Sequence, residues 1–282
     1  MKLSLPLHDS FPGTVTLPVE HRRIFMINRP DIEHWWAVES MIASYNHVYK
    51  VVYKTTYQEH GPIGVSVYDN APIASFHYEF LGLSPDPQAV MDAVNEYPVP
   101  DDRRYVIDVF HAEPSDQSLK DTFAQFDHEF VRTGPILGLE LKSRNSFLSE
   151  NIYKAITLQE TEIANNSLTS EGERIHVQTL WDEHIHSFYA RVDGEAAGWV
   201  QLVTIYPEVG YINQLYVLEK FRRRKLGTAL VQAAHAQASG LGLKYMVLIP
   251  SDMAIPLYRR LGYSPLLYFS AFRPVLPVRV WA

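Results

Sequence analysis

The chain has 282 residues, of which 46% are hydrophobic and 20% are charged. That balance is too apolar for a disordered chain, and the length favours two domains over one, because domains typically hold about 100–200 residues. The net charge of −7 argues against a general nucleic-acid binder, which needs a basic surface to displace counterions from phosphates. The sequence has no cysteine, which excludes disulfides, thiolate nucleophiles and cysteine-based zinc sites.

The sequence carries no targeting or membrane signal. Pro6 breaks the short apolar run near the N-terminus, so the segment lacks the apolar core of a signal peptide. Because no stretch of about 18 uninterrupted apolar residues occurs, we expect no membrane-spanning helix. The expected location is the cytoplasm, and we expect no membrane partner.

The N-terminal half is predicted to mix helices and strands on one sheet. A proline suits the first turn of a helix, where its missing N–H would have no partner anyway. The sequence from Asp69 to Pro72 is typical of a turn between two strands. In chain order, the expected elements are a helix opened by Pro30 and Asp31, strands over 47–54, 64–68 and 73–80, a helix over 88–96, a strand over 105–110, a helix over 119–131 and a strand over 136–141.

A polar, turn-rich stretch over residues 143–151 lies near the midpoint and is the expected domain boundary. It divides the chain into an N-terminal α/β domain over residues 1–147 and a C-terminal domain over residues 148–282. Each segment is long enough to bury a core of its own.

The C-terminal half has clearer signals. Asp193-Gly194 is a hairpin turn, and Gly240 and Gly242 are expected to end a helix in the left-handed conformation. In chain order, the expected elements are a strand over 153–158, a helical region between 160 and 181, strands over 186–192, 197–204 and 210–217, a helix over 226–239, a strand over 245–249, a short helix over 256–261 ended by Gly262, and a strand over 265–272.

Both halves contain a strand, an Asp-led turn and a second strand, VSVYDNAPIASFHYEF in the first and SFYARVDGEAAGWVQL in the second. This pattern indicates an internal repeat in which one half has been altered. Hairpins of this kind also occur without any repeat, so both interpretations stay open.

The most informative stretch is a basic loop between the strand that ends at Val217 and the helix that begins near Gly227. The first N–H groups of a helix lack backbone partners, and the helix dipole adds positive potential there. A glycine lets the backbone approach a phosphate closely, and Arg222, Arg224 and Lys225 add further positive charge. The placement predicts a pyrophosphate site, although a basic run on its own would be read as a solvated surface.

This stretch resembles the signature of the GNAT superfamily of acyl-CoA-dependent N-acyltransferases. The family pattern of Arg or Gln, two residues, Gly, one residue, then Gly or Ala reads here as Arg224 to Ala229, and Ile212, Leu215 and Val217 fit the preceding strand. Many members carry glycine where this chain has Lys225, a departure that the backbone tolerates if φ is negative at that residue. The resemblance implies that the backbone of three strand residues binds the pantetheine arm and that turn amides bind the pyrophosphate of acetyl-CoA. These residues are Leu215, Tyr216 and Val217, and Arg224, Lys225, Leu226, Gly227, Thr228 and Ala229.

A second match follows downstream. Residues 254–263, AIPLYRRLGY, resemble the family's A-x-x-x-Y-x-x-x-G-F segment. The resemblance places Tyr258 near the thioester sulfur, where a phenol can donate to or protonate the leaving thiolate. Ser251 stands where the family usually has asparagine, and its shorter side chain weakens that cofactor contact. The resemblance covers about 120 residues and does not extend to the N-terminal half.

The attacking amine must lose a proton, which a carboxylate takes directly or through water in many such enzymes. Glu208 is the candidate base; the alternative interpretation is an exposed loop carboxylate. Tyr211 and Asn213 are candidates to orient the amine. A backbone N–H of their strand is the candidate group to hold the oxyanion. His184 and His186 share a strand face, yet no third ligand is identifiable, so we expect no metal.

The resemblance implies a C-terminal GNAT fold, a mixed and largely antiparallel sheet flanked by helices, behind a second α/β domain. That first domain is either a degenerate copy or a domain that shapes the acceptor site, covers a sheet edge or mediates association. The expected function is transfer of an acetyl group from acetyl-CoA to a small-molecule or peptide amine. The alternative is a non-catalytic acyl-CoA sensor. The amine acceptor and the oligomeric state are left open.

Overall fold

The computed structural model describes residues 33–68, 76–141, 150–166 and 174–275. These residues form two compact units, and neither is continuous in sequence. Of these residues, the unit here called N-terminal holds 33–38, 55–68, 76–136 and 265–275, and the unit called C-terminal holds 39–54, 137–141, 150–166 and 174–264. The expected boundary at 147/148 lies outside the described residues.

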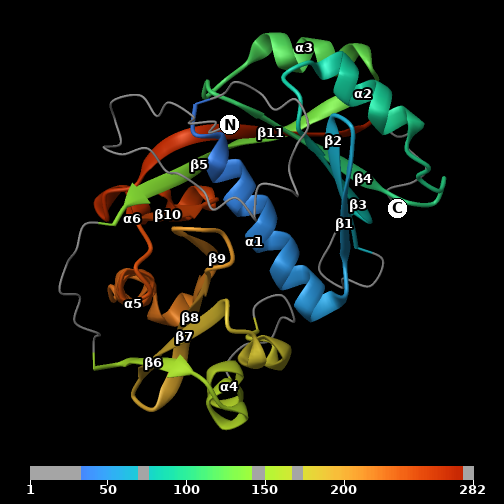
Figure 1. Ribbon diagram of the computed structural model, residues 1–282. Helices are drawn as coiled ribbons and strands as arrows, with labels where there is room; N and C mark the ends of the chain where they lie inside the picture. The colour runs from blue at the N-terminus through green and yellow to red at the C-terminus, as the bar shows by residue number, and fades with distance from the viewer. Residues whose placement is uncertain (1–32, 69–75, 142–149, 167–173, 276–282) are drawn as a thin grey trace, which may run out of the picture. The chain divides into compact units, whose positions relative to one another are not determined.

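The C-terminal unit is built on a mixed sheet (Figure 1). Its strand order is the end of β5, then β10-β9-β8-β7-β6; β9 and β10 are parallel, and the pairs β5/β10, β9/β8, β8/β7 and β7/β6 are antiparallel. In chain order the elements are the end of helix α1 (Trp35–Tyr53), the end of β5 (His128–Glu140), β6 (Ile152–Ala155), α4 (Leu158–Asn165), β7 (Ile185–Val192), β8 (Glu195–Val203), β9 (Val209–Val217), α5 (Leu226–Gly240), β10 (Tyr245–Leu248) and α6 (Ile255–Arg260).

Helices cover both faces of this sheet. On one face, Val200 and Leu202 of β8 join the buried core that contains Leu230 and Ala234 of α5. On the other face, Trp199 of β8 packs with residues of α4. This alternation of contacts along β8 is what a strand buried on both faces requires.

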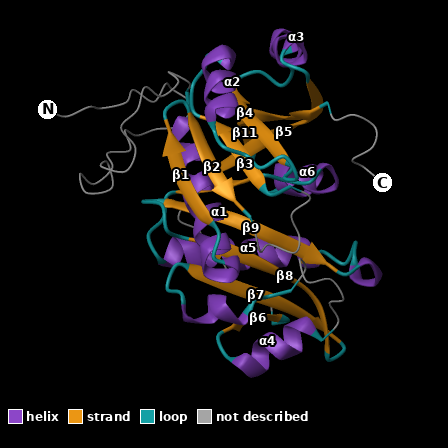
Figure 2. Ribbon diagram, turned by 90° about the vertical axis from the view of Figure 1, so that its right-hand side faces the viewer, coloured by secondary structure: helices purple, strands orange, loops and turns teal. Residues whose placement is uncertain are grey.

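The N-terminal unit has a sheet of its own order, β1-β2-β3-β4-β11-β5. Helices α2 and α3 lie side by side over it, as Figures 1 and 2 show, and enclose a core that includes Phe80, Met91 and Phe123. The elements are β1 (Thr56–His60), β2 (Ile63–Val67), β3 (Tyr78–Gly82), α2 (Pro87–Glu96), β4 (Tyr105–His111), α3 (Gln117–Gln125), the first part of β5, and β11 (Ser264–Pro274).

The two units repeat one order of elements. Three antiparallel strands, a helix, and a strand parallel to the third occur as β1-β2-β3-α2-β4 and again as β7-β8-β9-α5-β10. The hairpin pattern seen in the sequence is therefore part of a longer structural repeat. The last strand of the chain, β11, pairs with β4 of the N-terminal unit.

Several sequence predictions need correction. Residues 47–53 continue helix α1 and are not a strand, because tyrosines at positions 45, 49 and 53 stack along one helical side in successive ring contacts. The helix predicted over 119–131 ends at Gln125, since Asp127 takes a positive φ of 58° and β5 starts at His128. Strand β1 was not predicted. Gly240 belongs to α5, and Gly242 alone has the expected left-handed backbone.

A buried carboxyl pair lies in the N-terminal unit. The Tyr68 hydroxyl donates to Glu79 at 2.5 Å, and Glu79 is also hydrogen-bonded to Asp108. Burial raises the pKa of Glu79, and burial together with the charge of Glu79 raises the pKa of Asp108 well above its usual value, with Arg132 opposing that rise. The two carboxyls therefore share a proton in the folded state.

We predict that this pair makes stability fall as pH rises. Because the folded pKa is raised, the stabilisation is complete below the ordinary carboxyl value of about 4 and is lost as pH rises through the folded value. Asp108→Asn should flatten this dependence in chemical denaturation between pH 5 and 9. Asp121→Asn, at an exposed residue of α3, is the control. If the free energy of unfolding depends on pH equally in wild type and Asp108→Asn, the shared proton is contradicted.

Candidate cofactor and acceptor site

Strand β9 separates from β10 after its first three residues. The two strands pair only from Val209 to Tyr211, whereas β9 continues to Val217. Residues 209–212 are buried and residues 213–217 are only half-buried, while β8 covers the other edge of the strand. Beyond the separation, backbone groups of β9 on the β10 side are left for a ligand that can pair with a strand.

A register shift marks the point of separation. Gln201 of β8 is opposite Gln214, and Leu202 is opposite Ile212, so Asn213 is an extra residue in β9. The Asn213 side-chain amide donates to Gln201 Oε1 at 2.8 Å. An extra residue of this kind bends the strand and re-aims its side chains, as bulges near functional sites do.

The loop after β9 is anchored by one aromatic side chain. Phe221 is buried and holds the short 3₁₀ turn Glu219–Phe221, while the basic residues that follow it are exposed. The Arg222 Nε donates to the Val217 carbonyl at 3.1 Å, and the Arg224 guanidinium lies 5.5 Å from the Phe221 ring centre. The anchored loop holds its cations at the end of β9.

Helix α5 begins without a side-chain cap. Lys225 is its N-cap residue and makes no capping bond, so the first N–H groups of α5 are not satisfied by a side chain. The N-termini of α2, α3 and α4 are each capped, by Asp86, Asp116 and Thr157 respectively. The uncapped, basic start of α5 is therefore suited to bind an anion.

The negative φ that would make lysine tolerable at position 225 is not observed. Lys225 has φ 62° in the left-handed region, where a Cβ is strained. The loop accepts this strain at Arg223 too, with φ 63°. Gly227 has a negative φ, and a Cβ there would lie 3.4 Å from Leu257 Cδ2, an ordinary contact. The fold itself does not require glycine at position 227.

Tyr258 of α6 lies in the same core as the start of α5. It is 3% exposed, and its ring is 5.3 Å from that of Tyr263 at a steep angle. Burial raises the pKa of Tyr258 far above its usual value, so the phenol stays protonated and can act as a donor. The contact between Leu257 and the Gly227 position brings α6 against the basic turn.

Two candidate residues have other surroundings. Glu208 precedes β9 and forms an ion pair with Lys244 at 2.5 Å, and its carbonyl accepts from the Lys244 and Tyr245 amides. It therefore lies at the end of β9 opposite Val217. Ser251 is exposed just after β10, at the start of a short 3₁₀ turn, and makes no capping bond.

Within the part of the chain that the structure describes, the histidines near β7 belong to no group of three or more His, Cys, Asp or Glu side chains that could hold a metal ion. His47 is hydrogen-bonded to Asp182 at 2.9 Å, and its ring is 5.9 Å from that of His184. Burial and the nearby Lys154 lower the pKa of His186 to about 4, so its imidazole is neutral near pH 7. No helix within the described ranges is long and apolar enough to cross a membrane.

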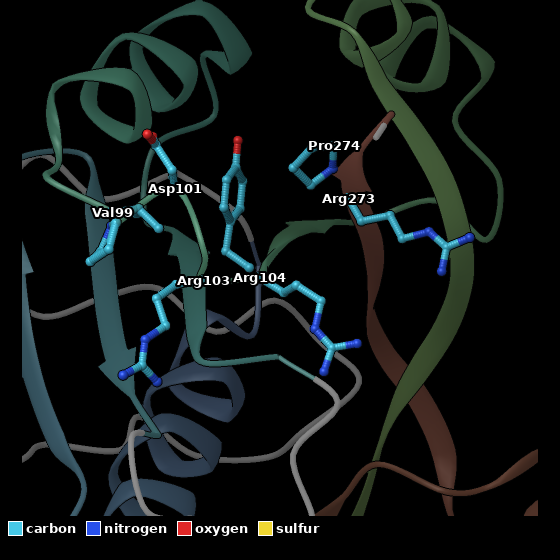
Figure 3. Close-up of a pocket in the computed structure, with 8 residues that line it drawn as sticks. Val99, Asp101, Arg103, Arg104, Arg273 and Pro274 are labelled. Atoms are coloured by element: carbon cyan, nitrogen blue, oxygen red, sulfur yellow. The ribbon is translucent and has the colours of Figure 1, made fainter. Parts of the chain in front are cut away.

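The N-terminal unit has hollows of different chemistry. One, of about 210 Å³, is lined by Arg103, Arg104 and Arg273, but Figure 3 shows these side chains pointing in different directions and not toward a common point. Another, of about 320 Å³, lies at the starts of α2 and α3, where Asp86 and Asp116 already cap both helices. Neither hollow reproduces the uncapped basic turn of α5.

Comparison with known proteins agrees with this geometry. Residues 152–263 match the family described as the acetyltransferase (GNAT) family. A GCN5-related N-acetyltransferase from Kribbella flavida has a similar structure, with a TM-score of 0.60 at 18% identity, covering 84% of this chain and 95% of that chain. A GCN5-related N-acetyltransferase from Sphaerobacter thermophilus is also similar, with a TM-score of 0.51 at 16% identity, covering 84% of this chain and 91% of that chain.

A tandem GNAT protein from the clavulanic acid biosynthesis pathway also shares the fold, with a TM-score of 0.50 at 15% identity, covering 75% of this chain and 77% of that chain. The comparison with curated proteins gives no match. The fold is thus that of acetyltransferases with a second α/β domain in front. Its C-terminal half is a GNAT acetyltransferase domain.

Sequence reasoning found the basic turn and Tyr258 but did not single out Gln201 or Ser187. Gln201 is 2% exposed among the buried residues 196–203 of β8, and Ser187 is directly opposite it on β7. The available signal was a polar residue among apolar neighbours in each strand, which does not by itself distinguish a site from a satisfied core position.

We predict that Gly227→Glu abolishes coenzyme A binding, because its carboxylate would occupy the place of the pyrophosphate. Calorimetry should show affinity near the micromolar level for wild type. Gly240→Glu is the matched control, since it adds the same charge at the far end of α5, where a Cβ meets open space. Unchanged affinity in a folded Gly227→Glu variant would refute the assignment.

Lys225→Gly should raise the free energy of unfolding by about 0.5–1 kcal/mol, because glycine adopts a positive φ without strain. Lys225→Ala keeps the strained backbone while losing the charge, so it should give no such gain. Urea denaturation of both variants tests this, and a gain of equal size for alanine would show that charge repulsion, not φ, is the cause.

Proposed function

We propose that this protein is an N-acetyltransferase that moves an acetyl group from acetyl-CoA to an amine. The observation that carries the proposal is the combination of an open β9 edge with the uncapped basic start of α5. A strand edge suits the amide groups of pantetheine, and a helix start suits a pyrophosphate. The GNAT match over the same residues supports acetyl-CoA as the donor.

The proposed reaction is direct attack. The amine nitrogen forms a bond to the thioester carbonyl carbon, the carbon–sulfur bond breaks, and the thiolate leaves. Protonated Tyr258 donates to that sulfur, and an N–H of β9 near Asn213 stabilises the oxyanion. Only the free amine can attack, so an ammonium acceptor first gives one proton to solvent water; the second N–H proton is lost as the carbon–sulfur bond breaks and is taken up by the leaving thiolate. Because Glu208 is held by Lys244, we do not assign it as the base.

The second candidate function is a non-catalytic acyl-CoA sensor. Two observations favour a sensor. Glu208 is paired with Lys244, and Ser251 is exposed and makes no capping bond, so both weaken the predicted set of site residues. Acetyl-CoA turnover against a panel of amines separates the two functions. Binding without any transfer would favour the sensor.

Tyr258→Phe should lower turnover by about 10²–10⁴-fold while leaving coenzyme A affinity nearly intact, because it removes a donor to the leaving thiolate and little else. Tyr263→Phe is the matched control, since Tyr263 is also a buried tyrosine but directs its hydroxyl to His235 at 2.8 Å. Steady-state rates decide the point, and wild-type turnover in Tyr258→Phe would show that this ring only packs.

A further inference from the structure

The sheet face opposite α5 is where an acceptor can approach. Helices α5 and α6 occupy the other face together with Tyr258, since both belong to one core cluster. A donor bound between the basic turn and β9 places its thioester at the strand separation. The amine must then reach the carbonyl from the α4 side of β9.

A row of neutral polar side chains crosses this face. Ser187 of β7 and Gln214 of β9 are the two residues opposite Gln201, and Asn213 is hydrogen-bonded to Gln201, so the row runs over β7, β8 and β9. Gln201 shares its face with Trp199, and Ser187 shares its face with Tyr189, because side chains alternate along a strand. Both aromatic residues belong to the cluster on the α4 side.

Apolar residues flank the row on both sides. Tyr189 and Trp199 lie on one side, and the pair Ile185 and Val203 lies on the other. Polar side chains between two buried apolar rows carry a desolvation cost unless each one is hydrogen-bonded.

One member of the row is unsatisfied. Ser187 is 4% exposed, and its hydroxyl has no hydrogen-bond partner among the described residues. Gln201 could have reached toward it but accepts from Asn213 instead. A buried hydroxyl without a partner indicates a group that is to be supplied from outside the chain.

The hydrogen bond between the Asn213 and Gln201 side chains leaves one acceptor and one donor unused. It uses Asn213 Nδ2 and Gln201 Oε1, so Asn213 Oδ1 and Gln201 Nε2 remain for another partner. If both amides were reversed, one C=O and one N–H would still remain. The row therefore presents this acceptor, this donor, the Ser187 hydroxyl and the half-buried Gln214 carboxamide, with no charged side chain.

We propose that Ser187, Gln201 and Asn213 bind a carboxamide carried by the amine acceptor next to its nitrogen. The acceptor's amide N–H donates to Asn213, and its C=O accepts from Gln201 and Ser187. The substrate class is the α-amino amides, which includes peptide N-termini. A carboxylate in the same place offers no N–H and loses solvation without meeting a positive charge. This inference rests on the proposed function.

The test compares alaninamide, alanine and isopropylamine as acceptors for the full chain with saturating acetyl-CoA. Values of kcat/KM are expressed per concentration of free amine, which removes the differences in amine pKa. Alaninamide should exceed isopropylamine by about 10-fold or more, as two or three hydrogen bonds predict, and alanine should be the poorest. Equal values for alaninamide and isopropylamine would overturn the assignment.

Ser187→Ala should reduce the alaninamide to isopropylamine ratio by about 3–10-fold, chiefly through KM, because it deletes one hydrogen bond to the acceptor. Ser66→Ala, at a fully buried serine of the N-terminal unit, should leave that ratio unchanged. If the hydroxyl is only structural, Ser187→Ala shifts the unfolding midpoint and leaves the ratio as in wild type, which overturns the inference. Absence of transfer to every amine overturns the proposed function and this inference together, whereas transfer without amide preference overturns the inference alone.

Discussion

The anion site depends on the N–H groups at the start of α5, which no side chain caps. Their orientation is fixed by the helix, and they cost free energy when left without a partner. Lys225 gives no cap, so nothing in its side chain competes with an incoming anion. The buried Phe221 and the Arg222 contact to β9 hold the loop that leads into the helix. The strained backbone at Lys225 fits a turn shaped for a ligand and not for stability alone.

The N-terminal unit has the corresponding helix with a capped start. Its strand β3 is also followed by a helix and then by a parallel strand, so the order of elements is the same. Yet Asp86 caps α2, accepting from the Gln88 amide at 3.0 Å. A carboxylate of the chain itself thus occupies the place that a phosphate would take. The connection is also short, running from residue 83 to 86, whereas residues 218–225 join β9 to α5. The repeat keeps the architecture and loses the anion site.

Local signals in the sequence predicted most of the C-terminal unit. The basic run before Gly227 and the Asp193-Gly194 turn are short-range features, and the structure has a helix start and a hairpin at those places. The strand prediction for residues 47–53 was wrong. It followed from the preference of Val and Tyr for strands, whereas contacts distant in sequence, such as Tyr53 with His176, hold these residues in α1. The pairing of β11 with β4 could not be predicted for the same reason. The row around Gln201 is also non-local, because it exists only once three strands are in register.

Counting the coenzyme A molecules bound per chain tests the assigned anion site, because the two units share an order of elements, yet α5 starts with uncapped basic residues and its counterpart α2 is capped by Asp86. Native mass spectrometry of the full chain, titrated with coenzyme A through saturation, counts the bound molecules without assuming any reaction. The account predicts one molecule per chain, lost in Gly227→Glu. Two molecules per chain, or one that persists in the folded Gly227→Glu protein, would contradict it.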